Sequence, residues 1–146
     1  MISKDKASGS DRPRVVDTRP AGEGHAVVSV AGGTGVAMSR PCVQCPWRRS
    51  NDGSFPAEAF RQSANTAYDA SMSTFACHMT MLDDPLICAG SILASPHNLA
   101  LRIKEVMGDL DPGAIDDDGA DLHPDYRSMA IANGVGPDEE VLKPCR

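Results

Sequence analysis

The chain is poor in the residues that build a large hydrophobic core. Leu, Ile, Val and Phe together number 27 of 146 residues, and the aromatic set comprises one Trp, two Tyr and three Phe. This fraction falls just under the roughly 20% below which highly charged chains tend toward disorder. Because the net charge is only −6, we expect a folded domain that needs a source of stability besides apolar burial.

The sequence also lacks long apolar runs. No stretch approaches the about 18 apolar residues of a membrane span, and the first residues show no apolar segment of the secretory type. We therefore expect a cytoplasmic protein without membrane association. In a reducing compartment, clustered cysteines indicate metal or redox chemistry more often than disulfides. The odd count of five cysteines favours the same interpretation.

Positive charge is scarce in the larger part of the chain. Residues 1–40 have a net charge of +2, whereas residues 41–146 have a net charge of −8. Contacts with nucleic-acid phosphates need cationic side chains. Direct binding to nucleic acid is therefore not favoured, although Arg40, Arg48 and Arg49 keep it open.

Four of the five cysteines lie between residues 41 and 90, as Cys42-x2-Cys45, Cys77 and Cys88. The two-residue spacing lets one tight turn aim two thiolates at a single ion. Four thiolates suit Zn²⁺ or an iron–sulfur cluster far better than Ca²⁺ or Mg²⁺. We predict a metal site formed by Cys42, Cys45, Cys77 and Cys88, with zinc as the first choice and an iron–sulfur cluster as the alternative.

His78 is an alternative ligand in this set, because it directly follows Cys77. Neighbouring residues of an extended strand point to opposite faces, so both side chains reach one ion only if the backbone turns between them. We prefer Cys77 as the ligand and place His78 beside the site or facing a partner.

Two chemical alternatives compete with a structural metal. A dithiol oxidoreductase could use Cys42 and Cys45, but the strand and long helix that flank such a motif are missing. A zinc enzyme would need an open coordination position and a base, and no convincing base is found. The question of catalysis stays open, and we favour a protein that is not an enzyme.

Trp47, Arg48 and Arg49 follow the CxxC motif directly and have two interpretations. Trp and Arg are favoured as interface anchors, so the three residues could bind a partner. Alternatively, Trp47 covers the metal and Arg48 pairs with a carboxylate of the acidic loop, residues 109–121. The remaining candidates have ordinary interpretations: helix caps or surface positions for His97 and His123, a solvated turn for 116–118, and a spare thiol for Cys145.

The pattern of the chain predicts an α+β fold, with a disordered tail over 1–24 and one metal-binding domain over 25–146. Strands at 25–30 and 36–39 would form a short hairpin around a glycine turn, and 73–76 would be a strand that leads to Cys77. Three to four helices are expected, at 56–67, 89–94, 98–107 and 124–133, the last two ended by Gly108 and Gly134.

Several blocks of the sequence resemble a known but uncharacterised family. PCVQCPWRRSNDGSFP, FACH, CAGSIL, HNLALRI and MAIANG are similar to the signature blocks of a domain-of-unknown-function family of small proteins seen in bacteriophages and high-GC bacteria. The resemblance covers about residues 40–146. It implies that Cys42, Cys45, Cys77, His78 and Cys88 occupy the family's motif positions, and it implies no established activity.

Together these features predict a small zinc protein that acts by binding a macromolecular partner. If the phage association holds, the partner would be a host protein or protein–nucleic acid complex of transcription, nucleic-acid processing or defence, which the protein would regulate or inhibit. The acidic domain could occupy a basic groove that nucleic acid normally uses.

Overall fold

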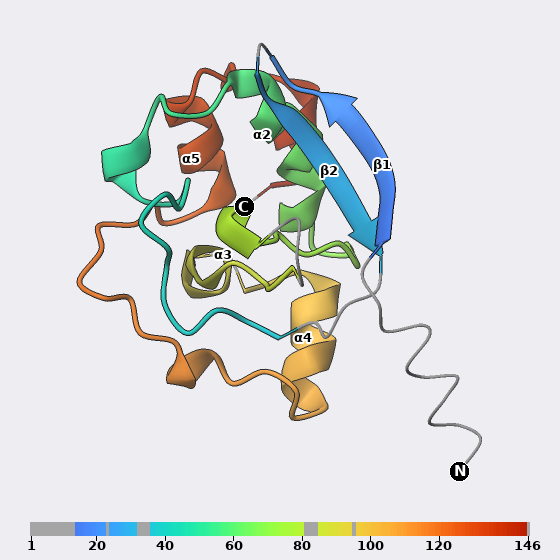
Figure 1. Cartoon of the computed structure of the whole chain (residues 1–146), viewed down its shortest axis with the longest axis vertical. Coiled ribbons are helices and arrows are strands. Elements are labelled where there is room, and N and C mark those ends of the chain that lie inside the picture. Colours follow the sequence, from blue (N-terminus) through green and yellow to red (C-terminus); the bar gives the residue numbers. More distant parts are fainter. Residues whose placement is uncertain (1–13, 23, 32–35, 81–84, 95, 146) are drawn as a thin grey trace.

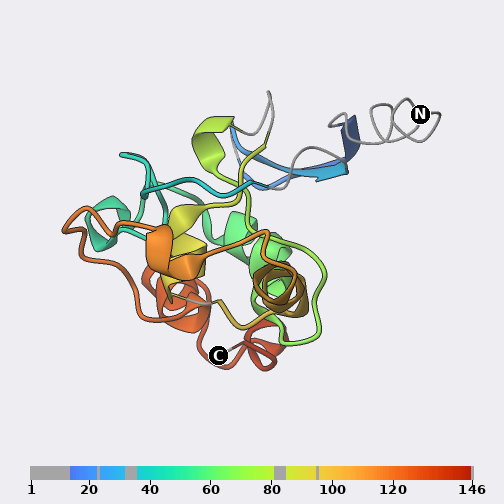
Figure 2. The same cartoon turned by 90° about the horizontal axis from the view of Figure 1, so that it is seen from below.

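A computed structural model describes residues 14–22, 24–31, 36–80, 85–94 and 96–145. A two-stranded antiparallel hairpin lies along one side of a body of short helices joined by long irregular segments (Figure 1). The perpendicular view places the hairpin at one edge of this body (Figure 2). The architecture is α+β, as the sequence predicts.

The hairpin pairs β1 (Arg14–Pro20) with β2 (Ala26–Ala31), and its register is irregular between Val15 and Asp17. β-branched residues in both segments favour this extended pairing. The predicted disordered tail over 1–24 therefore needs correction at 14–20, and the hairpin crosses the predicted domain boundary. The sequence suggested the strand at 25–30 but not its upstream partner. The glycine turn at 32–35 and residues 1–13 lie outside the described residues.

The segment predicted as a strand at 36–39 makes a different contact. Ala37 forms a parallel bridge with Ile87, and Ala76 forms an antiparallel bridge with the same residue. These are isolated bridges, so neither segment is a full strand. They bring the chain before Cys42 next to the two segments that carry Cys77 and Cys88.

The predicted helices form close to their expected positions. Pro56 precedes α2 (Ala57–Ser63), which continues as a 3-10 turn to Ala67. α3 (Ala89–Ala94) starts directly after Cys88. Two further helices begin at capping side chains that accept backbone N–H bonds, Asn98 for α4 (Leu99–Val106) and Asp125 for α5 (Tyr126–Ala132). Gly108 and Gly134 follow the last two helices with φ of 83° and 102°, the left-handed geometry predicted for their ends.

The main core surrounds Trp47. Its indole meets the rings of Phe75 and Tyr126 edge to face, each with ring centroids 5.9 Å apart. Tyr126 is itself fixed by hydrogen bonds from its hydroxyl to the carbonyl of Phe60 at 2.6 Å and with the Ser63 hydroxyl at 2.8 Å. Cys45 and Cys88 belong to the same buried cluster, so the core and the predicted metal site are one structure.

A smaller core lies under α3 and α4, and it contains Ile87, Ile92, Leu101 and Leu110. α4 buries Ala100 and Leu101, while Val106 and Met107 are exposed. Part of the apolar face predicted for this helix is therefore exposed to solvent. None of the helices in the described part of the chain is long and apolar enough to cross a membrane.

Candidate functional site

The CxxC motif forms a tight turn, which we call the knuckle (residues 42–45). The N–H of Cys45 donates to the carbonyl of Cys42 at 3.1 Å, and the N–H of Arg48 donates to the carbonyl of Cys45 at 3.1 Å. Two successive turns therefore place the side chains of Cys42 and Cys45 on one short piece of backbone.

Two side chains that follow the knuckle satisfy its carbonyl groups. Arg48 donates from Nε to the carbonyl of Cys42 at 2.8 Å and from Nη2 to that of Pro41 at 3.0 Å. Asn51 donates from Nδ2 to the carbonyls of Val43 at 3.0 Å and Cys45 at 2.9 Å. These bonds fix the turn, and they explain why Arg and Asn stand three and six residues after Cys45. Sequence analysis missed the role of Asn51.

The acidic loop supports the same region from outside. Arg48 lies 4.0 Å from a carboxylate oxygen of Asp118, and the N–H of Arg49 donates to the carbonyl of Asp121 at 2.9 Å. Arg48 and Leu122 form an antiparallel bridge. The interpretation in which Arg48 pairs with a carboxylate of the acidic loop agrees with this geometry.

Cys77 and Cys88 approach the knuckle on two segments held side by side. The N–H of Cys77 donates to the carbonyl of Leu86 at 2.6 Å, and the N–H of Cys88 donates to that of Phe75 at 2.8 Å. The thiols of Cys77 and Cys88 are buried, as is that of Cys45.

The structure brings the four predicted cysteine ligands into mutual interaction. The sulfur atoms of Cys45 and Cys88 are 3.6 Å apart. Cys77 and Cys45 lie near enough to Cys42 to raise the pKa of its thiol. One pair of sulfurs, 45 with 88, is thus in contact, and Cys42 lies on the same knuckle as Cys45 with Cys77 in its neighbourhood.

The thiols differ in acidity. The hydrogen bond from Cys88, helped by the N–H of Trp47 and the charge of Arg48, lowers the pKa of Cys45 to about 7 despite its burial. Burial and the neighbouring Cys77 and Cys45 raise the pKa of Cys42 to about 11. The hydrogen bond with Cys45, together with burial, raises the pKa of Cys88. Cys45 therefore loses its proton more easily than Cys42 or Cys88.

As the side chains lie, no group of three or more His, Cys, Asp or Glu residues within the described ranges is arranged to hold a metal ion. The side chain of His78 is outside those ranges. Its backbone starts a 3-10 turn (His78–Thr80) directly after Cys77, so the chain turns between the two residues. Which of them is a ligand stays a prediction.

Gly90, which sequence analysis did not select, makes room for the cluster. A Cβ atom at this position would lie 2.9 Å from the sulfur of Cys45 and 2.8 Å from the Cβ of Trp47. The backbone of α3 therefore packs directly on the knuckle, and only glycine permits this approach.

The three predicted partner-binding residues lie in different environments. Trp47 is 1% exposed and has a buried Nε1 without a hydrogen-bond partner in the described part of the chain. Its position in the core corrects the interpretation of Trp47 as a partner-facing anchor, because a buried indole cannot contact a partner. Arg48 is held against the knuckle, and Arg49 is exposed beside Asp121, at 3.2 Å.

The histidine at 123 also differs from its predicted surface or capping role. His123 is 2% exposed, and its Nε2 lies 2.7 Å from a carboxylate oxygen of Asp52. The backbone N–H of His123 donates to the carbonyl of Trp47 at 2.9 Å. This pair ties the loop after the knuckle to the segment before α5. No pattern in the sequence links residues so far apart.

The remaining candidates, His97, residues 116–118 and Cys145, have ordinary structural environments. His97 has its Nε2 2.8 Å from the carbonyl oxygen of Ala67. Residues 116–118 form an exposed turn in which the N–H of Asp118 donates to the Asp116 side chain at 2.9 Å. Burial raises the pKa of Cys145 to about 11, and its thiol lies in the core.

Comparison with known proteins gives a family but no characterised relative. No curated protein and no solved structure matches the chain. The family match excludes the hairpin and starts five residues before the knuckle, so it contains every cysteine discussed above. This agrees with the resemblance to an uncharacterised family noted in the sequence. The chain belongs to the family of unknown function DUF6283, whose model matches residues 37–146.

Proposed function

We propose that the protein binds one structural metal ion, zinc, through Cys42, Cys45, Cys77 and Cys88. The observation that carries this proposal is the 3.6 Å approach of the Cys45 and Cys88 sulfurs, with Cys42 on the same knuckle and Cys77 on the segment paired with that of Cys88. A chain with few large apolar residues gains most from such a site, because a structural zinc contributes folding energy directly.

The sulfur positions support a tetrahedral site in part. A zinc ion with Zn–S bonds of about 2.3 Å holds its sulfurs about 3.8 Å apart. The sulfur atoms of Cys45 and Cys88 are 3.6 Å apart, close to the sulfur–sulfur distance of such a site. Ion binding would require Cys42 and Cys77 to turn toward the same point, which side-chain rotation can provide.

The packing around Cys45 favours a single ion over a cluster. Gly90 approaches this sulfur so closely that a Cβ atom on the glycine would lie 2.9 Å from it. An iron–sulfur cluster adds inorganic sulfide next to the thiolates and needs more space. The cluster keeps the same four ligands and is the alternative that metal analysis would reveal.

A structural role is favoured over catalysis by the ligand set. Four thiolates fill the coordination shell of zinc, whereas catalytic sites keep one position for water or substrate. Three of the four cysteines are buried. A dithiol oxidoreductase or a zinc enzyme would instead require an exposed sulfur or an open position.

Metal analysis of protein purified without oxygen tests the site. We expect one zinc per chain in the wild type, loss of zinc in Cys88→Ser, and unchanged zinc in Cys145→Ser, the matched control outside the cluster. Iron with sulfide and a visible absorbance band would replace zinc by an iron–sulfur cluster. Absence of any metal would contradict the proposal and favour the dithiol alternative.

We further propose that the metal-supported domain acts by binding a macromolecular partner, as a regulator or inhibitor of a transcription, nucleic-acid or defence complex. Val43 at the tip of the knuckle is 84% exposed. Arg40 and Arg49 are exposed on either side of it in the sequence. An exposed apolar tip on an acidic domain, with these two arginines nearby in the sequence, offers a surface with distinct chemistry.

Affinity capture from a host lysate tests this role, with identified proteins compared between variants. We expect the doubly substituted Val43→Asp, Arg49→Glu protein to lose a partner that Lys143→Glu retains, because Lys143 lies far from the knuckle in the sequence and is exposed. Equal capture of a partner by the wild type, the double variant and Lys143→Glu would argue against the knuckle as the binding surface. Strong salt dependence with bound nucleic acid would indicate direct nucleic-acid binding.

A further inference from the structure

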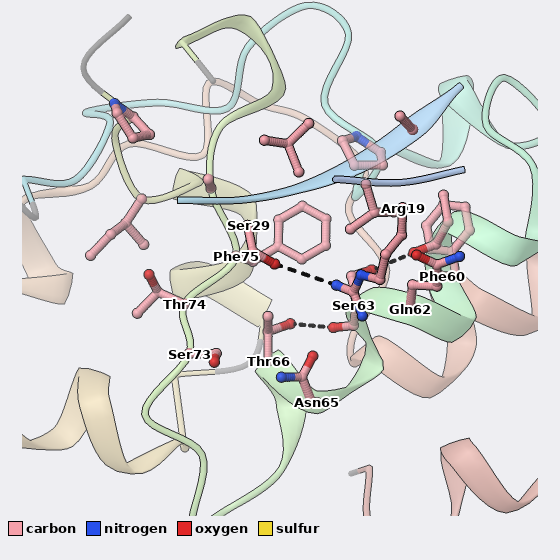
Figure 3. A pocket seen from close by; sticks show the side chains of 18 of the residues that line it. Arg19, Ser29, Phe60, Gln62, Ser63, Asn65, Thr66, Ser73, Thr74 and Phe75 are labelled. Atoms are coloured by element: carbon pink, nitrogen blue, oxygen red, sulfur yellow. Dashed lines mark hydrogen bonds between the residues drawn. The ribbon is translucent and has the colours of Figure 1, made fainter. Parts of the chain in front are cut away.

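A cavity of about 600 Å³ opens between the hairpin and the helical body (Figure 3). Its walls come from β2, from α2 with the turn that follows it, and from the extended segment 72–76. Small-molecule sites in proteins have volumes of about 300–1,000 Å³. The cavity therefore has the size of a ligand site.

The chemistry of the lining is mixed and electrically one-sided. Three aromatic rings contribute apolar surface, those of Phe55, Phe60 and Phe75. Arg19 is the charged residue among the described residues that line the cavity, and none of these described residues is acidic.

Arg19 points into the cavity from the end of β1 (Figure 3). Its Nη2 donates to the Ser29 hydroxyl at a long distance of 3.4 Å, and its Nε lies 3.2 Å from a carboxylate oxygen of Asp17, which does not line the cavity. The Nε makes no hydrogen bond of good geometry within the described residues, and the Oε1 of Gln62 is likewise buried without a partner there.

We propose that this cavity binds a small organic anion with an aromatic body. The anionic group would accept hydrogen bonds from the Arg19 guanidinium, which presents a planar fork suited to carboxylate and similar groups. The ring would pack against Phe75 and the other phenylalanine rings of the lining. A donor group on the ligand would satisfy Gln62.

The cavity lies against the backs of the cysteine segments. Pro46, Ala76 and Ile87 line it, and each is the direct neighbour of a cysteine of the cluster. A bound ligand would therefore touch the same backbone that positions Cys45, Cys77 and Cys88. The site uses other side chains, so the inference stands whether or not the cluster holds metal.

Nuclear magnetic resonance titration of the full chain tests the site with two probes of equal shape, 2-naphthoate and its neutral analogue 2-naphthamide. We expect saturable binding with chemical-shift changes centred on Ser29, Thr74 and Phe75. Naphthoate should bind at least about tenfold more tightly than naphthamide, because a hydrogen bond to a charged group is worth more than a neutral one.

Substitution of the arginine then isolates its contribution. Arg19→Gln should bring naphthoate down to the affinity of naphthamide, whereas Arg19→Lys should retain part of the preference. Arg14→Gln, on the same strand and outside the cavity lining, should change neither affinity. Equal affinities in the wild type, shifts centred elsewhere, absence of saturable binding, or an unchanged preference in Arg19→Gln would each overturn the proposal.

Discussion

The guanidinium of Arg48 binds the backbone of the cysteine turn, with Nε donating to the carbonyl oxygen of Cys42 at 2.8 Å. The same side chain reaches the carbonyl of Pro41 and lies near Asp118. One arginine thus connects the knuckle to the acidic loop. It orients Cys42 without being a ligand itself.

Replacing Arg48 by lysine should weaken metal binding while leaving the ligands in place. Lysine keeps the charge but lacks the planar fork that reaches two carbonyls at once. Substituting a residue that orients metal ligands typically lowers the metal affinity by about 10–100-fold. Competition with a chromophoric zinc chelator would measure the change. Arg49→Lys is the control, and equal losses in both variants would contradict the role of Arg48.

Gly90→Ala should destabilise the fold through overlap with the knuckle. The new methyl group would lie within 3 Å of the Cys45 sulfur and the Trp47 Cβ, and overpacking of this kind costs about 1–3 kcal/mol. Urea denaturation would measure the loss. Gly113→Ala is a matched control, since its Cβ would meet only the flexible Asp111 carboxylate at 3.3 Å. Equal stability of Gly90→Ala and wild type would disprove the close approach.

Local sequence signals predicted much of this molecule. The last two helices were recognisable from the glycines that end them, Gly108 and Gly134. These signals lie within a few residues of the structure they determine. The four cysteines were recognisable as candidate metal ligands because thiolates suit only a few metal ions and clusters.

Long-range relationships were not predictable from these signals. The strand at 14–20 was missed because its valines stand among charged residues, and its partner lies beyond a turn. The His123–Asp52 pair joins residues 71 positions apart. The burial of Trp47 depends on Phe75 and Tyr126, which reach it from distant segments. Which side chains become buried depends on such contacts between distant segments, and these contacts are visible only in the assembled fold.

Removing the Tyr126 hydroxyl should destabilise the core without changing its shape. The hydroxyl donates to the carbonyl of Phe60 and pairs with Ser63. Tyr126→Phe leaves a buried carbonyl without this donor, at a cost of about 1–3 kcal/mol. Chemical denaturation would measure it. Tyr68→Phe, which loses one bond to Val141 at the edge of the core, is the comparison and should cost less.

Glu139 should contribute stability that depends on pH. Arg61 donates to both of its carboxylate oxygens, at 2.8 and 3.2 Å, and the N–H of Gly136 donates to it at 2.6 Å. These bonds, led by Arg61, lower the pKa of Glu139 from its ordinary 4.5. A lowered folded-state pKa gives stability that is present above the unfolded pKa and is lost as the pH falls through the folded one.

Thermal unfolding of Glu139→Gln at several pH values would test this. The variant should be less stable than wild type at pH 7, and the difference should shrink below the ordinary pKa of 4.5. Each comparison uses the two proteins at the same pH, so loss of metal in acid affects both. Glu105→Gln, at an exposed position, should follow the wild type. A difference that persists unchanged in acid would contradict the ion pair as its source.

If the proposed zinc is bound, its removal should unfold the core around Trp47. A structural zinc can supply about 10–16 kcal/mol in small finger domains, which equals or exceeds the about 5–15 kcal/mol net stability of a typical domain. Trp47 is the sole tryptophan and packs beside Cys45, so its fluorescence reports on this region directly. A strong chelator should shift its emission to that of an exposed indole, and added zinc should restore it. If the emission and the unfolding midpoint stay unchanged after elemental analysis shows the metal gone, the apolar core alone holds the fold.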